Sequence, residues 1–381
     1  MKEYFFRFTK LFSVQLALYI FVNGLFIFKY ISRAGINPYY IIVIYSFLIL
    51  ALTFFYYRFS SKISEKIFKI SYFSLLSIMV LAIMGFLISI EPYSIQVDRW
   101  SALSYFWDYF FQGKYPYSAH THISLTNFPS PFPFWHGVNL VFYLLGDVGI
   151  GLIFFLLLTA YVIKYFFETY RKSFFFILLL FTSSAYWWEV AVRSDALSNA
   201  ILVFVLILWI NKKNLTLSSN LILISAFCGL IASTRLSAIM PLALYFFKPY
   251  LQLPSKQKLI FPVLVLGITL FTFLPFIFWD TSTWIFFTRN PFMSQADKGY
   301  YSIFFAMIAL GYIMAMRLKN VEQFFSTASL FIFTFILVSQ FGLFLRSDLD
   351  KHFITNSIAD ISYFTLITPY CLASLTSKMQ S

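Results

Sequence analysis

Apolar residues dominate this chain in runs that are long enough to cross a bilayer, and the runs recur from end to end. About 20 consecutive apolar residues span the hydrocarbon core as a helix. We place about twelve membrane segments, at residues 11–29, 38–57, 67–90, 138–163, 173–188, 195–210, 219–234, 236–248, 258–278, 300–316, 323–345 and 357–376. The pattern predicts an all-α fold, a polytopic transmembrane helical bundle.

The composition agrees with a membrane protein. Of the 381 residues, 60% are hydrophobic and only 11% are charged, whereas a soluble domain carries about 25% charged residues. The net charge of +13 is explained by basic loops that obey the positive-inside rule, so no nucleic-acid partner is expected. We expect a multi-pass protein of the cell (inner or plasma) membrane.

The basic clusters set an orientation. They lie at residues 58–69, 164–172, 212–213, 248–258 and 317–319. Placing them inside puts both termini in the cytoplasm. Every Asp and every His then falls on the outer side, although neither residue type was used to choose the orientation. We infer that the polar chemistry lies on the outer face.

The longest loop between predicted spans, residues 91–137, opens with EPYSIQVDRWSALSYFWDYFFQGKYPYS. Apolar residues recur in it at helical spacing, at Trp100, Leu103, Trp107 and Phe110. This spacing predicts an interfacial juxtamembrane helix, with Ser101 and Ser104 on its solvated side. Asp98 stands at the start of that helix, where it is either a helix cap or a functional acid.

Two later segments place ionisable residues at the ends of spans, where such groups are costly and are functional candidates by default. AYWWEVAVRSDALSNA holds Glu189, Arg193 and Asp195, and FCGLIASTRLSAIM holds Arg235. Arg193 either snorkels to the interface or binds a ligand. Asp195 caps the next helix, orients an acceptor or holds a divalent cation with Asp98. The guanidinium of Arg235 either matches a lipid phosphate or pairs with Asp195 for structure.

The order of these motifs resembles that of a known family. A loop acid and a juxtamembrane helix are followed by GKYPY, FPSPFPF, LLGDVG, RSDAL and GLIASTR. This order is similar to that of the GT-C superfamily, integral membrane glycosyltransferases that use a polyprenyl-phosphate sugar and include mannosyltransferase-like enzymes. The resemblance covers about residues 70–250. It implies three parts: an added N-terminal transmembrane hairpin (1–66), a catalytic module (67–250) that includes the outer loop 91–137, and C-terminal transmembrane helices (251–381).

The resemblance also implies a function. The chain would move a sugar from a polyprenyl-phosphate donor in the membrane lipid to a hydroxyl of a glycan, lipid or protein acceptor, with inversion and an Asp general base. Asp98 is the expected base, with Glu91 and Asp195 as further catalytic candidates. Arg235, Arg193 and Arg346 are expected at the donor phosphate, and Arg99, Tyr115, Tyr117 and His136 at the substrate. No cofactor is assigned; a divalent cation, Mg²⁺ or Mn²⁺, is left open.

Two other function classes fit the same hydropathy pattern. One is a transporter or flippase for a lipid-linked saccharide, and the other is an outer-leaflet polysaccharide polymerase or ligase. A transporter places its ionisable residues near the bilayer midplane, whereas here they gather at the outer interface. Polymerases and ligases usually carry a large outer loop late in the chain, whereas the largest loop here is early. Both contrasts favour the glycosyltransferase.

Overall fold

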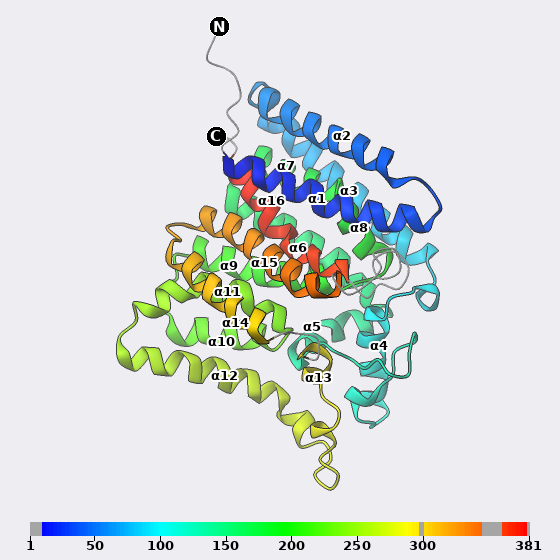
Figure 1. Ribbon diagram of the computed structural model, residues 1–381, viewed down its shortest axis with the longest axis vertical. Helices are drawn as coiled ribbons and strands as arrows, with labels where there is room; N and C mark the ends of the chain where they lie inside the picture. Colours follow the sequence, from blue (N-terminus) through cyan, green and yellow to red (C-terminus); the bar gives the residue numbers. More distant parts are fainter. Residues whose placement is uncertain (1–9, 297–300, 345–359, 379–381) are drawn as a thin grey trace. The chain divides into compact units, whose positions relative to one another are not determined.

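The computed structural model describes residues 10–296, 301–344 and 360–378. Within these residues it contains sixteen α-helices joined by loops and short 3-10 helices, and no β-sheet (Figure 1). The predicted all-α class is therefore confirmed. The chain divides into two compact units that alternate along the sequence, unit 1 at residues 1–79, 163–188 and 319–381, and unit 2 at residues 80–162 and 189–318.

Unit 1 draws its helices from three separate parts of the chain. They are α1 (Lys10–Arg33), α2 (Pro38–Phe59), the first part of α3 (Glu65–Ser89), α7 (Tyr170–Phe181), the first part of α8 (Ser184–Ala191), α15 (Val321–Phe344) and α16 (Thr368–Ser377). Helix α1 packs against α2 and α16, and α16 also packs against α7 and α15. Helices from both ends of the chain therefore share one core.

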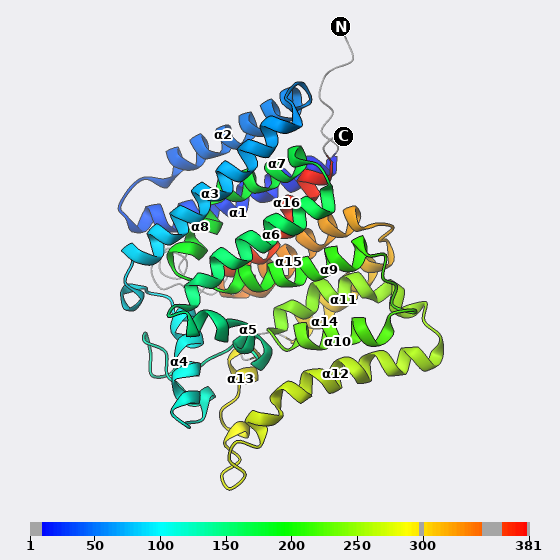
Figure 2. The ribbon, with the colours of Figure 1, turned by 180° about the vertical axis from the view of Figure 1, so that it is seen from behind.

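Unit 2 holds the remaining helices and the long loop 91–137. They are α4 (Arg99–Phe111), α5 (Pro133–Leu144), most of α6 (Gly151–Phe167), α9 (Ala196–Lys212), α10 (Leu221–Ala232), α11 (Leu236–Leu251), α12 (Ser255–Ile277), α13 (Pro291–Ala296) and α14 (Tyr301–Met316). Helices α10 and α12 run side by side, as Figures 1 and 2 both show.

Six described helices are long and apolar enough to cross a membrane, and a bent pair formed by α7 and α8 makes a seventh if the two count as one span. These helices support a multi-pass membrane protein. The prediction of about twelve membrane segments, of which 219–234 and 236–248 were expected to be short, is confirmed in part. Four predicted segments form shorter apolar helices, namely α9, α10, α11 and the described part of α14. The predicted span 138–163 is divided into α5 and α6, because Gly146 takes a φ of 103° and Asp147 caps the next turn through Gly149 N.

The break between α7 and α8 bends the pair by 63°, and α1 supplies polar partners for it. Asn23 Oδ1 accepts hydrogen bonds from Ala185 N at 3.1 Å and Ser183 Oγ at 2.7 Å. Tyr19 donates its hydroxyl to the Leu179 carbonyl at 2.6 Å. Backbone groups freed by a break inside a membrane need partners from neighbouring helices, and buried polar residues of α1 provide them.

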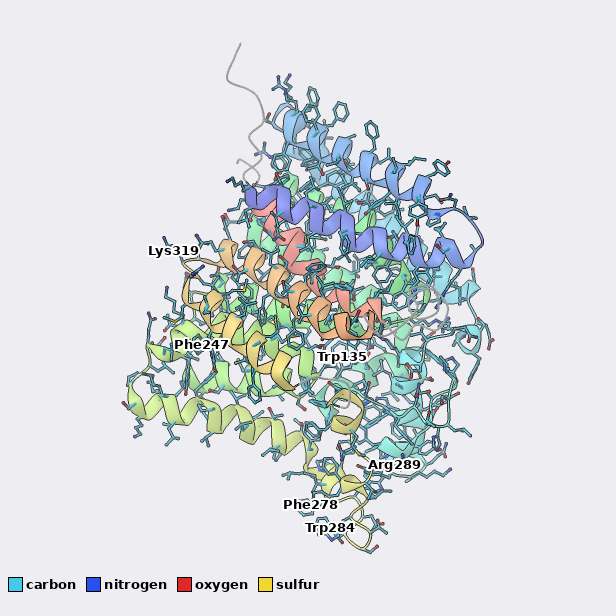
Figure 3. The ribbon with its side chains drawn as sticks, in the orientation of Figure 1. Trp135, Phe247, Phe278, Trp284, Arg289 and Lys319 are labelled. Carbon is cyan, nitrogen blue, oxygen red and sulfur yellow. The ribbon has the colours of Figure 1, made fainter. Side chains whose placement is uncertain are left out.

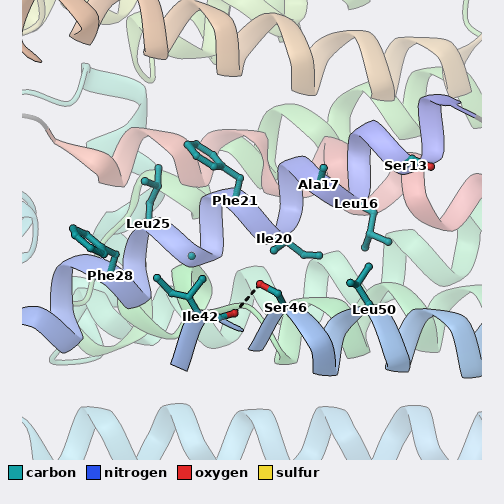
Figure 4. A pocket seen from close by; sticks show the side chains of 11 residues that line it. Ser13, Leu16, Ala17, Ile20, Phe21, Leu25, Phe28, Ile42, Ser46 and Leu50 are labelled. Carbon is teal, nitrogen blue, oxygen red and sulfur yellow. Dashed lines mark hydrogen bonds between the residues drawn. The ribbon is translucent and has the colours of Figure 1, made fainter. Parts of the chain in front are cut away.

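A groove of about 640 Å³ lies between α1 and α2 (Figure 4). Ser13 and Ser46 are the polar side chains in its lining, and the Ser46 hydroxyl donates to the Ile42 carbonyl of its own helix at 2.7 Å. The groove therefore presents a mostly apolar surface between two candidate membrane helices.

Candidate functional site

Polar side chains from four distant parts of the sequence meet in unit 2. An extended pairing of backbone groups brings two of these parts together: Phe132 N donates to the Thr234 carbonyl at 2.9 Å, and Phe134 N donates to the Ser233 carbonyl at 3.0 Å. The flanking prolines favour this extended conformation. The start of α5 is thereby held beside the start of α11.

Asp195 and Arg235 form a buried ion pair in this region. Arg235 Nη2 lies 2.5 Å from Asp195 Oδ2, and Trp135 Nε1 donates to the same oxygen at 2.5 Å. Burial alone would raise the pKa of Asp195, but the charges of Arg235 and Arg99 and these two hydrogen bonds outweigh it and lower the pKa. Asp195 is therefore an ionised carboxylate inside the protein. Although it occupies the N-cap position of α9, its side chain makes no capping hydrogen bond.

Several atoms around this pair keep unused hydrogen-bonding capacity. Asp195 Oδ1, Asn199 Nδ2 and Arg235 Nε are buried and have no hydrogen-bond partner within the described part of the chain. Asn199 follows Asp195 by one helical turn, so the two residues share a face of the chain. Buried polar groups are normally paired, and these three atoms could engage a ligand group that both donates and accepts hydrogen bonds.

Asp98 occupies the N-cap position of α4, but its carboxylate does not cap the helix. Its Oδ2 accepts a hydrogen bond of 2.8 Å from Asn127 Nδ2, and among the described residues its Oδ1 has no partner. The Asp98 side chain is half-buried. The capping interpretation therefore does not account for this acid, which keeps one carboxylate oxygen available.

Arg99, the next residue, connects the start of α4 to the segment before α9. Its Nη1 donates to Ser194 Oγ at 2.9 Å and lies 3.8 Å from Glu189 Oε1. Glu189 is fully buried, and its Oε2 accepts a hydrogen bond from Leu197 N at 3.0 Å. Because Arg99 also lowers the pKa of Asp195, it belongs to the same charged cluster as the Asp195–Arg235 pair.

Arg193 has a different environment, in which protein groups contact both terminal nitrogens of its guanidinium, while its buried Nε has no hydrogen-bond partner among the described residues. Its Nη2 donates to the carbonyls of Leu87 and Ile90 at 2.7 Å each, at the C-terminal end of α3. Its Nη1 lies 2.6 Å from Asp147 Oδ2. The residue is only 3% exposed and holds a left-handed φ of 50°. This geometry gives Arg193 structural contacts, and its contact with a donor phosphate stays a prediction.

The helix predicted after Asp98 forms as α4, but it is more buried than its sequence pattern predicts. Ser101 and Ser104 were expected on a solvated face, yet both are buried. Ser101 Oγ donates to the Asp98 carbonyl at 3.0 Å and lies 2.6 Å from His122 Nδ1. The returning part of the loop therefore covers this face of α4.

The expected substrate residues Tyr115, Tyr117 and His136 lie inside an aromatic cluster of unit 2. All three are buried, and the hydroxyl of Tyr117 donates to the Pro131 carbonyl at 3.3 Å. The ring of His136 stacks on Phe106 with 3.5 Å between centroids. Burial and the nearby Arg235 charge lower the pKa of His136 to about 3, so the imidazole is neutral. The three side chains pack the loop 91–137, and their contact with a substrate stays a prediction.

Glu91 and Arg346 complete the set of predicted site residues. Glu91 is exposed at the start of the loop, and Arg346 lies outside the described residues. Within the described part of the chain, no three His, Cys, Asp or Glu side chains gather as a metal-ligand set. The open assignment of a divalent cation therefore receives no support from the geometry.

Three functional candidates were missed in the sequence: Trp135, Asn127 and Asn199. Helical spacing from Asp195 could have indicated Asn199. The contacts of Asn127 and Trp135 depend on the course of the loop 91–137, which a periodic pattern of apolar residues does not predict.

The chain matches no protein family model, no curated protein and no solved structure. The similarity to the GT-C superfamily therefore rests on the order of the sequence motifs alone.

Proposed function

We propose that this protein is a membrane glycosyltransferase that moves a sugar from a polyprenyl-phosphate donor to an acceptor hydroxyl at the membrane surface. The observation that supports it best is the pairing of a free carboxylate with a buried charged cluster. Among the residues that the structure describes, Asp98 keeps one carboxylate oxygen without a partner. Its neighbour Arg99 joins the cluster of Glu189, Asp195 and Arg235. Charges buried in a membrane protein are costly and mark functional sites by default.

The reaction needs a base, and Asp98 is the proposed one. The acceptor hydroxyl oxygen forms a bond to the anomeric carbon of the sugar while the bond from that carbon to the phosphate oxygen breaks. The hydroxyl proton passes to the Asp98 carboxylate, and the electron pair of the broken bond leaves with the polyprenyl phosphate. A carboxylate near the sugar also stabilises an oxocarbenium-like transition state. Attack from the face opposite the phosphate inverts the anomeric carbon.

The departing phosphate needs positive charge rather than a proton. Arg235 and Arg99 are the proposed sources among the described residues, because a preorganised guanidinium stabilises developing negative charge. Arg235 contacts Asp195 through Nη2, and its Nε has no hydrogen-bond partner in the described ranges. Arg193 is not proposed for this role, because two carbonyls and Asp147 occupy it.

A lipid-borne donor explains why such a reaction would occur in a chain with six or seven candidate membrane helices. The proposed partners are the polyprenyl-phosphate sugar, surrounding membrane lipid and a glycan, lipid or protein acceptor. The proposed location is the inner or plasma membrane of the cell, with the reaction on the face opposite the cytoplasm.

The proposed base is tested by Asp98→Asn in proteoliposomes supplied with a radiolabelled polyprenyl-phosphate sugar and an acceptor. Asp108→Asn is the matched control: it makes the same change in the same helix, where the carboxylate accepts a hydrogen bond from the Tyr143 hydroxyl at 2.7 Å. We expect transfer to fall by about 10²-fold or more in Asp98→Asn and to persist in Asp108→Asn. Undiminished transfer in Asp98→Asn would refute the assignment of the base.

A further inference from the structure

The loop that follows α12, residues 278–290, carries aromatic side chains on two opposite faces. On one face, Trp279 and Phe286 pack with the aromatic cluster of unit 2. On the other face, Phe278, Trp284 and Phe287 are 58%, 44% and 66% exposed. The Trp284 ring lies 6.3 Å from that of Phe278 and 5.9 Å from that of Phe287, centroid to centroid. These three side chains form one exposed aromatic patch.

The turn that presents this patch is fixed by hydrogen bonds. Asp280 Oδ1 accepts from Ser282 N at 2.9 Å, its Oδ2 accepts from Thr283 Oγ1 at 2.7 Å, and its carbonyl accepts from Trp284 N at 2.9 Å. Trp284 holds a left-handed φ of 49°, which is unusual for a bulky residue. Such strained conformations persist where surrounding contacts impose them, and they concentrate at functional surfaces.

The patch continues an exposed apolar stripe along α12. The stripe residues are exposed and recur at helical spacing, at Leu259, Val263, Leu266, Leu270 and Leu274. Helix α12 is a candidate membrane span of 23 residues, about 35 Å long at 1.5 Å per residue. The hydrocarbon core is about 30 Å thick. A helix of this length that crosses the bilayer ends near the boundary of the hydrocarbon. The exposed aromatic patch, which follows the end of α12, would begin at that boundary.

We propose that the exposed aromatic patch lies in the headgroup interface of the bilayer, so that the loop 278–290 rests on the membrane at the end of α12 and does not project into water. Tryptophan and other aromatic residues are enriched at this level of membrane proteins. The partner is a phospholipid bilayer, and continuity with the stripe on α12 selects it over a second protein. Figure 3 shows Phe278 and Trp284 together on this loop, with Arg289 near them.

Two charged groups limit how deep the loop enters. Hydrogen bonds from Ser282 and Thr283 lower the pKa of Asp280 to about 2, so this carboxylate stays ionised and keeps the turn out of the hydrocarbon. Arg289 is exposed, and its guanidinium lies 4.1 Å from the centroid of the Phe128 ring. A cation at headgroup level is attracted by lipid phosphates.

The loop is also tied to the segment that contains the candidate site. The Tyr115 hydroxyl donates to the Arg289 carbonyl at 2.8 Å, and Arg289 covers Phe128. Contact of the patch with lipid headgroups would therefore set the height of the loop 91–137 above the bilayer. This last consequence rests on the proposed function, whereas the membrane contact itself does not.

Site-directed spin labelling in phospholipid liposomes tests the membrane contact without any sugar transfer. Labels are placed through Trp284→Cys and, separately, Phe287→Cys. Leu266→Cys in the middle of α12 and Ser282→Cys in the turn are the reference sites. The two native cysteines, Cys228 and Cys371, are both buried, so they should react slowly with the label. Labelling of the unsubstituted protein measures this background. Collision rates are measured with oxygen, which concentrates in lipid, and with a water-soluble nickel chelate.

We expect the labels at 284 and 287 to collide more with oxygen than with the nickel chelate, at a depth shallower than that of 266. The label at 282 should favour the nickel chelate. Labels at 284 and 287 that behave like the one at 282 would show a loop in water and overturn the proposal. Labels that neither reagent reaches would show a protein partner or a second copy on the patch, which would also overturn it. Phe287→Cys keeps the test valid if substitution at the strained Trp284 position prevents folding.

Discussion

Arg193 is predicted to stabilise unit 2 rather than to bind a ligand, and replacing it with alanine tests this interpretation. The substitution removes two hydrogen bonds of 2.7 Å to the Leu87 and Ile90 carbonyls and an ion pair of 2.6 Å with Asp147. A hydrogen bond from a charged donor contributes about 1.5–3 kcal/mol, and breaking a buried ion pair costs about 3–5 kcal/mol. These two energies describe partly the same contacts and are not added. The cost is also limited because water can reach the remaining Asp147 side chain, which is 23% exposed. We therefore expect Arg193→Ala to lower the free energy of unfolding by about 3 kcal/mol.

The two buried cysteines provide the assay. Cys228 lies in unit 2 and Cys371 in unit 1, so in a Cys371→Ala background a thiol-reactive fluorophore reports the unfolding of unit 2 alone. Equilibrium denaturation in mixed micelles then gives the free energy of unfolding. Arg289→Ala is the control, because that side chain is exposed and its removal, which ends the contact with the Phe128 ring, should change stability by about 1 kcal/mol or less.

A second substitution separates the side chain of Arg193 from its backbone. Because the φ of 50° is strained for a residue with a Cβ, Arg193→Gly should be about 1 kcal/mol less destabilising than Arg193→Ala. A loss below about 1 kcal/mol in Arg193→Ala, or a loss equal to that of Arg289→Ala, would refute the structural role. If transfer then also fell, the original assignment of Arg193 to a donor phosphate would regain support.

Two further predictions concern pH and packing in unit 2. Burial and the Arg235 charge lower the pKa of His136 from 6.5 to about 3, so between these pH values the unfolded state binds a proton that the folded state does not. The free energy of unfolding should therefore fall with decreasing pH by about 1.4 kcal/mol per pH unit. In denaturation curves recorded from pH 7 to pH 4, His136→Phe should flatten this slope, and an unchanged slope would contradict the assignment. Gly149→Ala should destabilise unit 2 by about 1–3 kcal/mol, because an added Cβ would lie 2.7 Å from Leu87 Cδ2. The control is Gly85→Ala in α3, where an added Cβ meets nothing within 4 Å. This substitution should be neutral or stabilising in the same denaturation assay.

Hydropathy predicted the fold class well because apolar runs long enough to span a bilayer are unambiguous in a sequence. It did not show where helices end or break within an apolar run, because local features set these points. Gly146 and Asp147 divide one apolar run into α5 and α6. The segments that became α9, α10 and α11 are apolar but end after 12 to 17 residues.

The candidate site could be predicted in part. Asp195 and Arg235 were singled out because ionisable residues next to spans are rare, and the structure brings them together. The contacts of Arg193 could not be predicted from the residues next to it in the sequence. Its partners are Leu87, Ile90 and Asp147, which lie about 50 to 100 residues away along the chain. The aromatic residues of the loop 91–137 look alike in sequence whether they pack a core or line a binding surface.

The central claim is sugar transfer from a lipid-linked donor, and the wild-type protein tests it most directly. Purified protein is reconstituted in liposomes that contain a polyprenyl-phosphate sugar labelled in the sugar ring, and an acceptor is added. The account predicts acceptor-dependent loss of label from the lipid, with one polyprenyl phosphate formed for each sugar transferred. Movement of the intact labelled lipid to the opposite leaflet, with no cleavage of the bond between sugar and phosphate, would show a flippase and contradict the account.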